Sequence, residues 1–343
     1  MLPGIPAIDQ RQNSDHGYPI RTMRKRRNAL SYVLLVTYLI SVVMLILTFA
    51  YLVSFGGLPL KDFLKMQVSP YFFILLLLVE LPSTSLLFVV IFIILGYAIV
   101  FAAVGTGFNS SISPIDSSNG FFSMMAPVLL IVSLIITVAE ESFGIPILGQ
   151  QPVTTAAYGG FVALIYAPFV EEFGFRILPL GILTFIPFIM HVRQPSKVVG
   201  DHPGYLVPPV KAFFIYLVAP GYYRSRYGGR NRVVDLILIL VTSGIFAYAH
   251  VYYGAWSWGK LFPIFVDGII LAVGYLKFGL YVDIPLHWFI NDFAGLELVD
   301  PSTLGFLVFV LIWCMVACVI GIIYSIPSVR RFFSSSRSGA ALR

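Results

Sequence analysis

Residues 168–179 read PFVEEFGFRILP and place two adjacent carboxylates, Glu171 and Glu172, together with the guanidinium of Arg176 inside an apolar segment. An ionised side chain at the centre of a membrane helix costs roughly 2.5 to 3.5 kcal/mol on insertion scales, so three of them in one segment need a role. The stretch therefore predicts a membrane helix that carries a cluster of charge, around which the rest of the chain is organised.

The spacing within this stretch separates the two carboxylates. On a helix, Glu172 and Arg176 are four residues apart and share a face, so they can pair and neutralise each other. Glu171 is rotated by about 100° from Glu172 and is left without that partner. The spacing is compatible with a purely structural ion network, and also with one carboxylate that is held and one that is free for chemistry.

The composition excludes a soluble globular protein. Hydrophobic residues make up 58% of the chain and charged residues 11%, against about 25% charged in soluble domains, and the mean hydropathy is +0.90. The chain is therefore predicted to be an all-α polytopic membrane protein, with the lipid bilayer as its surroundings. The net charge of +6 lies mostly beside the apolar segments. It indicates topology and attraction to anionic lipid, and not binding to nucleic acid.

About eight membrane-spanning helices are expected. The second apolar segment is ambiguous, because its roughly 34 residues would measure about 51 Å as one helix, while a division at Glu80-Leu81-Pro82 leaves the first half too short to span. It is taken as one long helix that is kinked or partly interfacial. The apolar segments cover residues 29–55, 71–104, 121–139, 154–190, 233–249, 261–276, 281–296 and 304–326. Pro179 and Gly181 are expected to break or bend the fourth segment just after Arg176.

The polar and basic stretches define the domain organisation. Residues 1–28 form a basic N-terminal segment, residues 29–326 one membrane domain, residues 191–232 a basic insertion within it, and residues 327–343 a basic tail. The excess of Lys and Arg places both termini and the insertion in the cytoplasm. The membrane would be the plasma membrane of a prokaryote or the endoplasmic reticulum of a eukaryote. The insertion is either a lid that shapes the substrate site or a tolerated loop on the lipid surface.

A second carboxylate pair, Glu140 and Glu141, ends the third apolar segment. It has no arginine at helical spacing, and a loop with Gly144, Pro146 and Gly149 follows it. The pair is therefore expected to be solvated and structural.

Polar side chains also interrupt later apolar segments. His250 ends one of them, and His287 and Asn291 lie four residues apart in another, so an imidazole and an amide would share one helix face. With a carboxylate, these groups can activate water and stabilise an oxyanion. One carboxylate and two imidazoles are equally the ligand set of a catalytic zinc. Counted from the cytoplasmic edge, however, His250 lies roughly 26 Å deep and His287 roughly 9 Å, so straight helices would not bring them together.

Three motifs follow one another on separate apolar segments: Glu171-Glu172-x-x-x-Arg176, Phe246-x-x-x-His250 and His287-x-x-x-Asn291. In this order they resemble the CAAX prenyl protease and bacteriocin-processing (ABI) family, in particular its Ras-converting type of intramembrane endopeptidase. The resemblance covers roughly residues 154–295, and the ordered set is more specific than any single motif. The long insertion is a departure that puts the substrate in doubt before the chemistry.

The resemblance implies an intramembrane active-site cavity and a role for each motif. Glu171 and His250 would activate the attacking water, while His287 and Asn291 would stabilise the oxyanion; Glu172 and Arg176 would be the supporting ion pair. No cofactor is favoured. Zinc, held by Glu171, His250 and His287, is the alternative, although the sequence lacks the His-Glu-x-x-His signature.

The implied reaction is removal of the C-terminal tripeptide from prenylated CAAX proteins or peptides, so the expected partner is a membrane-associated peptide. Bacteriocin processing, or a non-enzymatic immunity protein, is the runner-up. An ion-coupled transporter would also use intramembrane Glu, His and Arg, but such transporters commonly carry internal repeats and none is apparent. The oligomeric state stays open.

Overall fold

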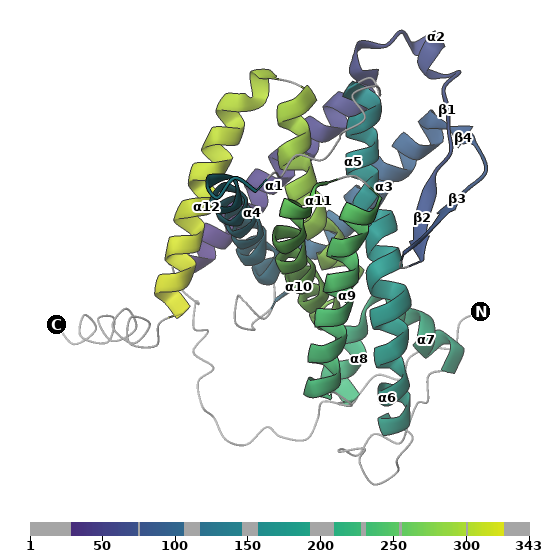
Figure 1. The fold of residues 1–343 in the computed structure, drawn as a ribbon, viewed down its shortest axis with the longest axis vertical. Coiled ribbons are helices and arrows are strands. Elements are labelled where there is room, and N and C mark those ends of the chain that lie inside the picture. The colour runs from purple at the N-terminus through teal and green to yellow at the C-terminus, as the bar shows by residue number, and fades with distance from the viewer. Residues whose placement is uncertain are drawn as a thin grey trace, which may run out of the picture.

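The computed structural model describes residues 29–74, 76–105, 117–145, 157–192, 209–227, 231–253, 256–299 and 301–325. Figure 1 shows a mostly helical molecule of long helices and one small β region. The long helices are α1 (Ala29–Val53), α3 (Leu86–Gly105), α4 (Ser118–Ser142), α5 (Ala157–Glu172), α6 (Ile182–Val192), α9 (Arg232–Tyr252), α10 (Leu261–Lys277), α11 (Leu280–Val299) and α12 (Leu304–Ser325). The short ones are η1 (Phe55–Gly57), α2 (Leu60–Phe63), η4 (Phe173–Gly181), α7 (Pro209–Val218), α8 (Pro220–Tyr227), η6 (Trp258–Lys260) and η7 (Pro301–Thr303).

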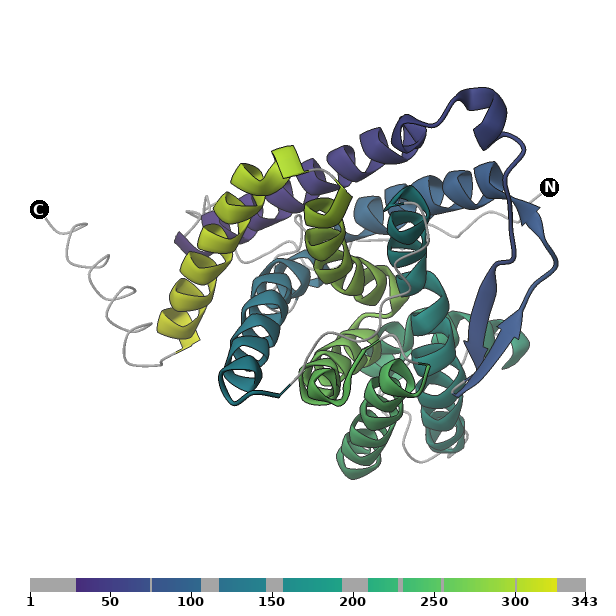
Figure 2. The ribbon, with the colours of Figure 1, turned by 45° about the horizontal axis from the view of Figure 1, so that its top comes forward.

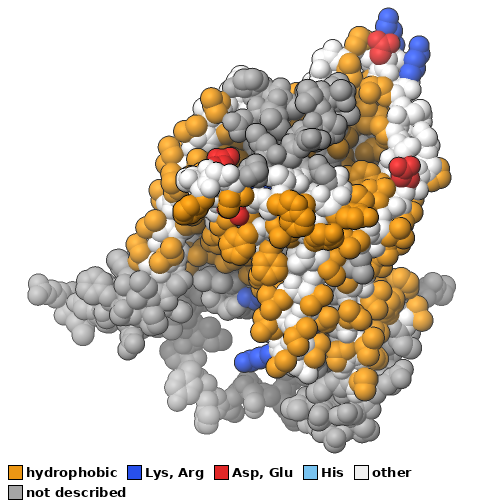
Figure 3. Space-filling view, viewed as in Figure 1, with side chains coloured by type: hydrophobic (Ala, Val, Ile, Leu, Met, Phe, Trp, Pro, Cys, Tyr) orange, Lys and Arg blue, Asp and Glu red, His pale blue; other side chains and the backbone are white. Residues whose placement is uncertain are grey.

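The described residues contain seven helices that are long and apolar enough to cross a membrane. Figure 3 shows hydrophobic side chains over most of the described surface in view. The prediction of a polytopic, mostly helical membrane protein is therefore confirmed. The span expected at 281–296 corresponds to α11, which carries Asp283, Asp292 and Glu297 and is more polar than the seven.

Helix α11 forms the centre of the core. It packs against α5, α3, α4 and α10, and Figure 2 shows it between α4 and α5. Its aromatic residues Trp288 and Phe289 are fully buried. Because neighbouring helices surround α11, its buried polar residues Asp283, His287 and Asp292 face protein instead of lipid, which is where intramembrane charge is tolerated.

The expectation of one long helix over residues 71–104 is wrong. Residues 71–74 and 77–80 form an antiparallel pair of strands, β2 (Tyr71–Ile74) and β3 (Leu77–Glu80), and α3 starts only at Leu86. A second short pair, β1 (Gln67–Val68) with β4 (Thr84–Ser85), lies at the base of the hairpin. Pro82 interrupts a helix at this point, and packing of the aromatic residues of β2 against α5 and η4 overrides the helical propensity of the leucines.

The fourth apolar segment is continuous through α5, η4 and α6. Instead of a break after Arg176, the chain widens into a π-helix over Phe173–Gly181, directly after Glu172. π-helical turns within α-helices occur frequently at functional sites. The change from α-helix to π-helix therefore begins within the motif Glu171-Glu172-x-x-x-Arg176.

Gly174 in η4 allows the hairpin to lie against this helix. A Cβ atom there would fall 2.5 Å from the carbonyl oxygen of Phe73, whereas one at Gly244 of α9 would meet nothing within 4 Å. We expect Gly174→Ala to displace the hairpin and to lower the unfolding free energy by about 1–3 kcal/mol. Thermal unfolding of the detergent-purified protein measures this, with Gly244→Ala as the matched control. Equal melting temperatures of the two variants would show that the hairpin does not need this contact.

Several expectations fall on residues outside the described part. These are the basic N-terminal segment 1–28, the tail 327–343, and residues 193–208 and 228–230 of the insertion. The rest of the insertion forms α7 and α8, and Arg224 of α8 is paired with Asp235 of α9. The insertion is thus anchored to the membrane domain at the first turn of α9. The cytoplasmic placement of the termini and the insertion stays a prediction.

Candidate active site

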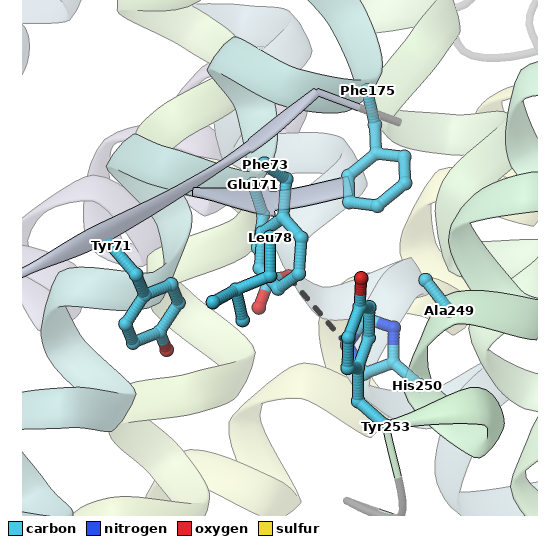
Figure 4. Close-up of a pocket in the computed structure, with 8 residues that line it drawn as sticks. All are labelled: Tyr71, Phe73, Leu78, Glu171, Phe175, Ala249, His250 and Tyr253. Atoms are coloured by element: carbon cyan, nitrogen blue, oxygen red, sulfur yellow. Dashed lines mark ion pairs between the residues drawn. The ribbon is translucent and has the colours of Figure 1, made fainter. Parts of the chain in front are cut away.

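Three helices bring Glu171 and both intramembrane histidines together. Glu171 lies at the end of α5 and is 9% exposed. His250 lies in the last turn of α9 and His287 in the second turn of α11. The Nε2 atoms of both imidazoles lie 3.5 Å from the same oxygen, Oε2 of Glu171. Figure 4 shows the contact of Glu171 with His250 as a dashed line.

The orientation of His250 is set within its own helix. Its Nδ1 lies 2.9 Å from the backbone carbonyl oxygen of Phe246. A carbonyl can only accept, so Nδ1 carries the proton and a neutral imidazole presents an unprotonated Nε2 to Glu171. The ring of Phe246 packs edge-on against both histidine rings, with centroid distances of 4.7 Å to His250 and 5.7 Å to His287. Both the backbone carbonyl and the ring of Phe246 therefore hold the imidazole of His250 in place.

His287 is oriented by Glu172. Its Nδ1 donates to Oε1 of Glu172 at 2.6 Å, while the other carboxylate oxygen of Glu172 lies 3.2 Å from Nε of Arg176. Both Glu172 and Arg176 are fully buried. Glu172 thus joins the arginine to the imidazole, and fixes which nitrogen of His287 faces Glu171.

Asp283 belongs to this network, although the sequence analysis did not single it out. Its Oδ2 lies 4.0 Å from Nε of Arg176, and the side chain is fully buried. Arg176 lies also over the ring of Phe246, 4.9 Å from its centroid. Asp283 is four residues before His287 on the same face of α11, so helical spacing from His287 is the signal that could have identified it.

Asn291 has a different immediate partner. It lies one turn beyond His287 on α11 and donates through Nδ2 to the backbone carbonyl oxygen of Leu164 in α5, at 3.1 Å. This bond ties α11 to the helix that carries Glu171. A carboxamide has two N–H groups, so one donor is used here and the predicted role of Asn291 at an oxyanion stays a prediction.

Glu171 and His250 open into a cavity of about 170 Å³. Figure 4 shows the hairpin crossing this cavity, with side chains from both of its strands. The lining residues are Tyr71, Phe73, Leu78, Glu171, Phe175, Ala249, His250 and Tyr253. Burial, with the nearby charge of Glu171 as a smaller cause, raises the pKa of the Tyr71 hydroxyl above its usual range. The wall is therefore aromatic and uncharged apart from the catalytic candidates.

The expected mismatch in depth between the two histidines is partly offset at the lower end of the bundle. Ile239 in the second turn of α9 and Leu276 near the end of α10 belong to one buried cluster, so α9 has already risen by about 10 Å, out of an expected difference of roughly 17 Å, when α11 begins. The start of α11 lies against the insertion, since a Cβ on Gly279 would fall 2.2 Å from the carbonyl oxygen of Val218 in α7. The helices of the insertion thus occupy the space below α11 and raise His287 towards His250.

The side chains of Glu171, His250 and His287 are possible ligands of a metal ion. Two imidazole nitrogens and a carboxylate are ligand types of zinc. Within the described part of the chain, however, no group of three or more His, Cys, Asp or Glu side chains is arranged to hold a metal ion. The geometry of the described residues therefore does not by itself define a metal site, and a chelator tests whether a metal takes part in the reaction.

The other carboxylate pair lies apart from this cavity. Glu140 and Glu141 end α4, and Glu141 is exposed. Neither residue lines the cavity. They provide matched controls for the two carboxylates of the site.

The fold and the site together define a polytopic helical membrane protein in which a buried carboxylate, two imidazoles and an arginine meet beneath a β-hairpin. Residues 153–293 match the family model described as type II CAAX prenyl endopeptidase Rce1-like, and this part of the chain is a domain of that protease family. The match spans all three motifs and confirms the resemblance inferred from them. Comparisons with curated proteins and with solved structures gave no match.

Proposed function

We propose that the protein is an intramembrane endopeptidase that removes the C-terminal tripeptide of prenylated CAAX proteins or peptides. The observation that carries the proposal is the convergence of two imidazole Nε2 atoms on one buried carboxylate oxygen, each at 3.5 Å. One water molecule could lie about 2.8 Å from both Glu171 Oε2 and His250 Nε2 and donate a hydrogen bond to each of them. Such a water is positioned for deprotonation inside a cavity with apolar walls.

Glu171 acts as the general base in the proposed reaction. It accepts a proton from the water while His250 Nε2 accepts the second hydrogen bond and orients the oxygen. The water oxygen attacks the carbonyl carbon of the scissile bond, and the carbonyl electron pair moves to its oxygen. The proton held by Glu171 then passes to the leaving nitrogen as the C–N bond breaks, which gives a new carboxyl terminus and a free amine.

His287 and Asn291 stabilise the oxyanion in this proposal. His287 in its protonated form can donate from Nε2, with the Glu172 carboxylate on Nδ1 as its counter-charge. Asn291 contributes the amide N–H that Leu164 does not use. Preorganised donors of this kind are worth about 10²- to 10³-fold each in known oxyanion holes.

The size of the cavity bears on how a prenylated substrate would bind. At about 170 Å³ it is smaller than the roughly 300–1,000 Å³ of pockets that enclose a whole small-molecule ligand. It has room for the scissile bond and an adjacent side chain. The prenyl chain would then lie outside it, against the apolar outer surface of the bundle or in lipid.

The test is cleavage of a fluorogenic farnesylated CAAX peptide by detergent-purified protein, with and without o-phenanthroline, beside the same peptide without the farnesyl group. We expect cleavage of the farnesylated peptide that survives the chelator. Chelator-sensitive cleavage would instead make Glu171, His250 and His287 metal ligands. Absence of cleavage of either peptide, in protein shown to be folded, would favour an immunity or scaffold function.

A further inference from the structure

The hairpin over the cavity has a hydrogen-bonding pattern that can be assigned residue by residue. Leu81 N–H donates to the carbonyl oxygen of Pro70 at 2.6 Å, which continues the register of β2 with β3. In an antiparallel pair, hydrogen-bonded and non-hydrogen-bonded positions alternate. The pairs Tyr71 with Glu80 and Phe73 with Leu78 are therefore non-hydrogen-bonded, and their backbone N–H and C=O groups point away from the partner strand.

The outer edge of β2 is occupied by the membrane domain. The carbonyl oxygen of Tyr71 accepts from the hydroxyl of Tyr166 in α5, at 3.3 Å. That of Phe73 lies against Gly174, where no side chain intervenes. Both carbonyl groups belong to non-hydrogen-bonded pairs, as the alternation along the hairpin requires. Their contacts hold the hairpin against α5 and η4.

Among the residues that the structure describes, none covers the outer edge of β3 in this way. The backbone groups of Leu78 and Glu80 make no hydrogen bond to any residue that the structure describes. A free strand edge of this kind is a template for pairing with another extended chain. Leu78 is also a cavity residue, together with Glu171 and His250, so the edge borders the catalytic cavity.

We propose that the substrate binds as an extended strand added to the outer edge of β3, which rests on the peptidase function proposed above. An added strand lies about 4.8 Å from its neighbour, and directly opposed residues share a face of the sheet. The substrate residue opposite Leu78 therefore faces the cavity that holds Glu171. Main-chain pairing of this type supplies affinity with little dependence on sequence.

The surroundings of the edge define the chemistry of the occupant. At the tip of the hairpin Ile74 and Leu77 are 40% and 60% exposed. The tip is tied down by the hydroxyl of Tyr253, which donates to the carbonyl oxygen of Leu76. An apolar, membrane-associated peptide in extended conformation matches this edge, whereas a helical segment exposes no backbone groups that could pair with it.

Backbone methylation of the peptide tests the pairing directly. A series of farnesylated CAAX peptides, each with one N-methylated residue, is measured for binding to the Glu171→Gln protein and for cleavage by wild type. N–H groups that face β3 alternate with those that face away, so we expect binding to weaken about tenfold at every second residue and to change little between them. A loss of binding on N-methylation that does not alternate from one residue to the next would overturn the proposal.

A pair of variants tests the same edge from the side of the protein. Leu78→Pro removes the outward N–H while leaving the bonds between β2 and β3, since proline is tolerated on a free edge. Leu78→Ala changes only the side chain. We expect Leu78→Pro to raise KM about tenfold with kcat within about twofold of wild type, and Leu78→Ala to have a smaller effect on KM. Equal KM values for the two variants would contradict the pairing.

The two measurements separate this proposal from the enzymatic one. If wild type cleaves the peptide but the effect of N-methylation does not alternate along it, the strand-addition proposal is wrong and the peptidase proposal stands. If the effect of N-methylation on binding alternates along the peptide but no peptide is cleaved, the strand-addition proposal is supported and the peptidase proposal is wrong. If Leu78→Pro does not fold, the N-methyl series decides alone, because it uses no change in the hairpin.

Discussion

Glu171→Gln is expected to lower kcat for peptide hydrolysis by about 10²- to 10⁴-fold, the range that a general base contributes. Gln preserves the shape of the side chain but cannot take a proton from water. Its amide can still occupy the space between the two imidazoles, so the fold should be retained. Initial rates on the farnesylated peptide measure the effect, with thermal unfolding as the check on folding.

Glu141→Gln is the matched control for Glu171→Gln. Glu141 belongs to an adjacent carboxylate pair in a membrane helix, but it is exposed and lies outside the cavity. Its substitution should leave kcat and KM unchanged within about twofold, since surface changes away from special features have small effects. Loss of activity in Glu141→Gln with retention in Glu171→Gln would mean that the wrong pair has been assigned to the chemistry.

Arg176→Ala is expected to destabilise the protein by about 3–5 kcal/mol and to lower the yield of folded protein. The substitution leaves Glu172 and Asp283 buried without their cation, at a place where both carboxylates are fully buried. It also removes the group that packs over the ring of Phe246. Fluorescence-detected size exclusion and thermal unfolding in detergent measure the loss.

Two further variants separate the ion network from other effects of Arg176→Ala. The triple change Arg176→Met, Glu172→Gln and Asp283→Asn removes all three charges, so it should be less destabilising than Arg176→Ala alone. Lys65→Ala removes an exposed cation and should change stability by less than about 0.5 kcal/mol. An Arg176→Ala protein with the melting temperature of wild type would show that the buried pair is not structural.

Local spacing predicted the parts of the site that depend on one helix. The pair of Glu172 with Arg176 follows from four-residue spacing, and the structure retains it even though η4 is π-helical. Spacing likewise placed His287 and Asn291 on one face of α11. The second partner of Glu172, the imidazole of His287, could not be read from the sequence, because it depends on how α11 packs against α5.

The hairpin was the main feature that the sequence did not reveal. Residues 71–80 are rich in Leu and Phe, and a short apolar run cannot be assigned to helix or strand by periodicity alone. Pro82 indicates a boundary, and the apolar residues before it are too few to span a membrane as a helix but enough for a strand. The pairing of β2 with β3 and the contacts of β2 with Tyr166 and Gly174 are tertiary interactions that no local sequence pattern predicts.

The predicted difference in depth between His250 and His287 was wrong for a related reason. Counting residues from the cytoplasmic edge assumes that all helices start at one level. The insertion helices α7 and α8 lie under the turn from α10 to α11, so α11 starts higher than α9. Asp283 shares a helix face with His287, but it belongs to none of the three motifs, so only its four-residue spacing from His287 indicates it.

The most direct test of Glu171-dependent hydrolysis is mass spectrometry of a farnesylated CAAX peptide after incubation in ¹⁸O-labelled water with wild-type protein or Glu171→Gln. For wild type, we predict a product shortened by the tripeptide that carries one heavy oxygen in its new carboxyl terminus, and formation of this product at least about 10²-fold more slowly by the variant. The same labelled product, formed at the same rate by both proteins, would contradict the assignment of Glu171 as the base.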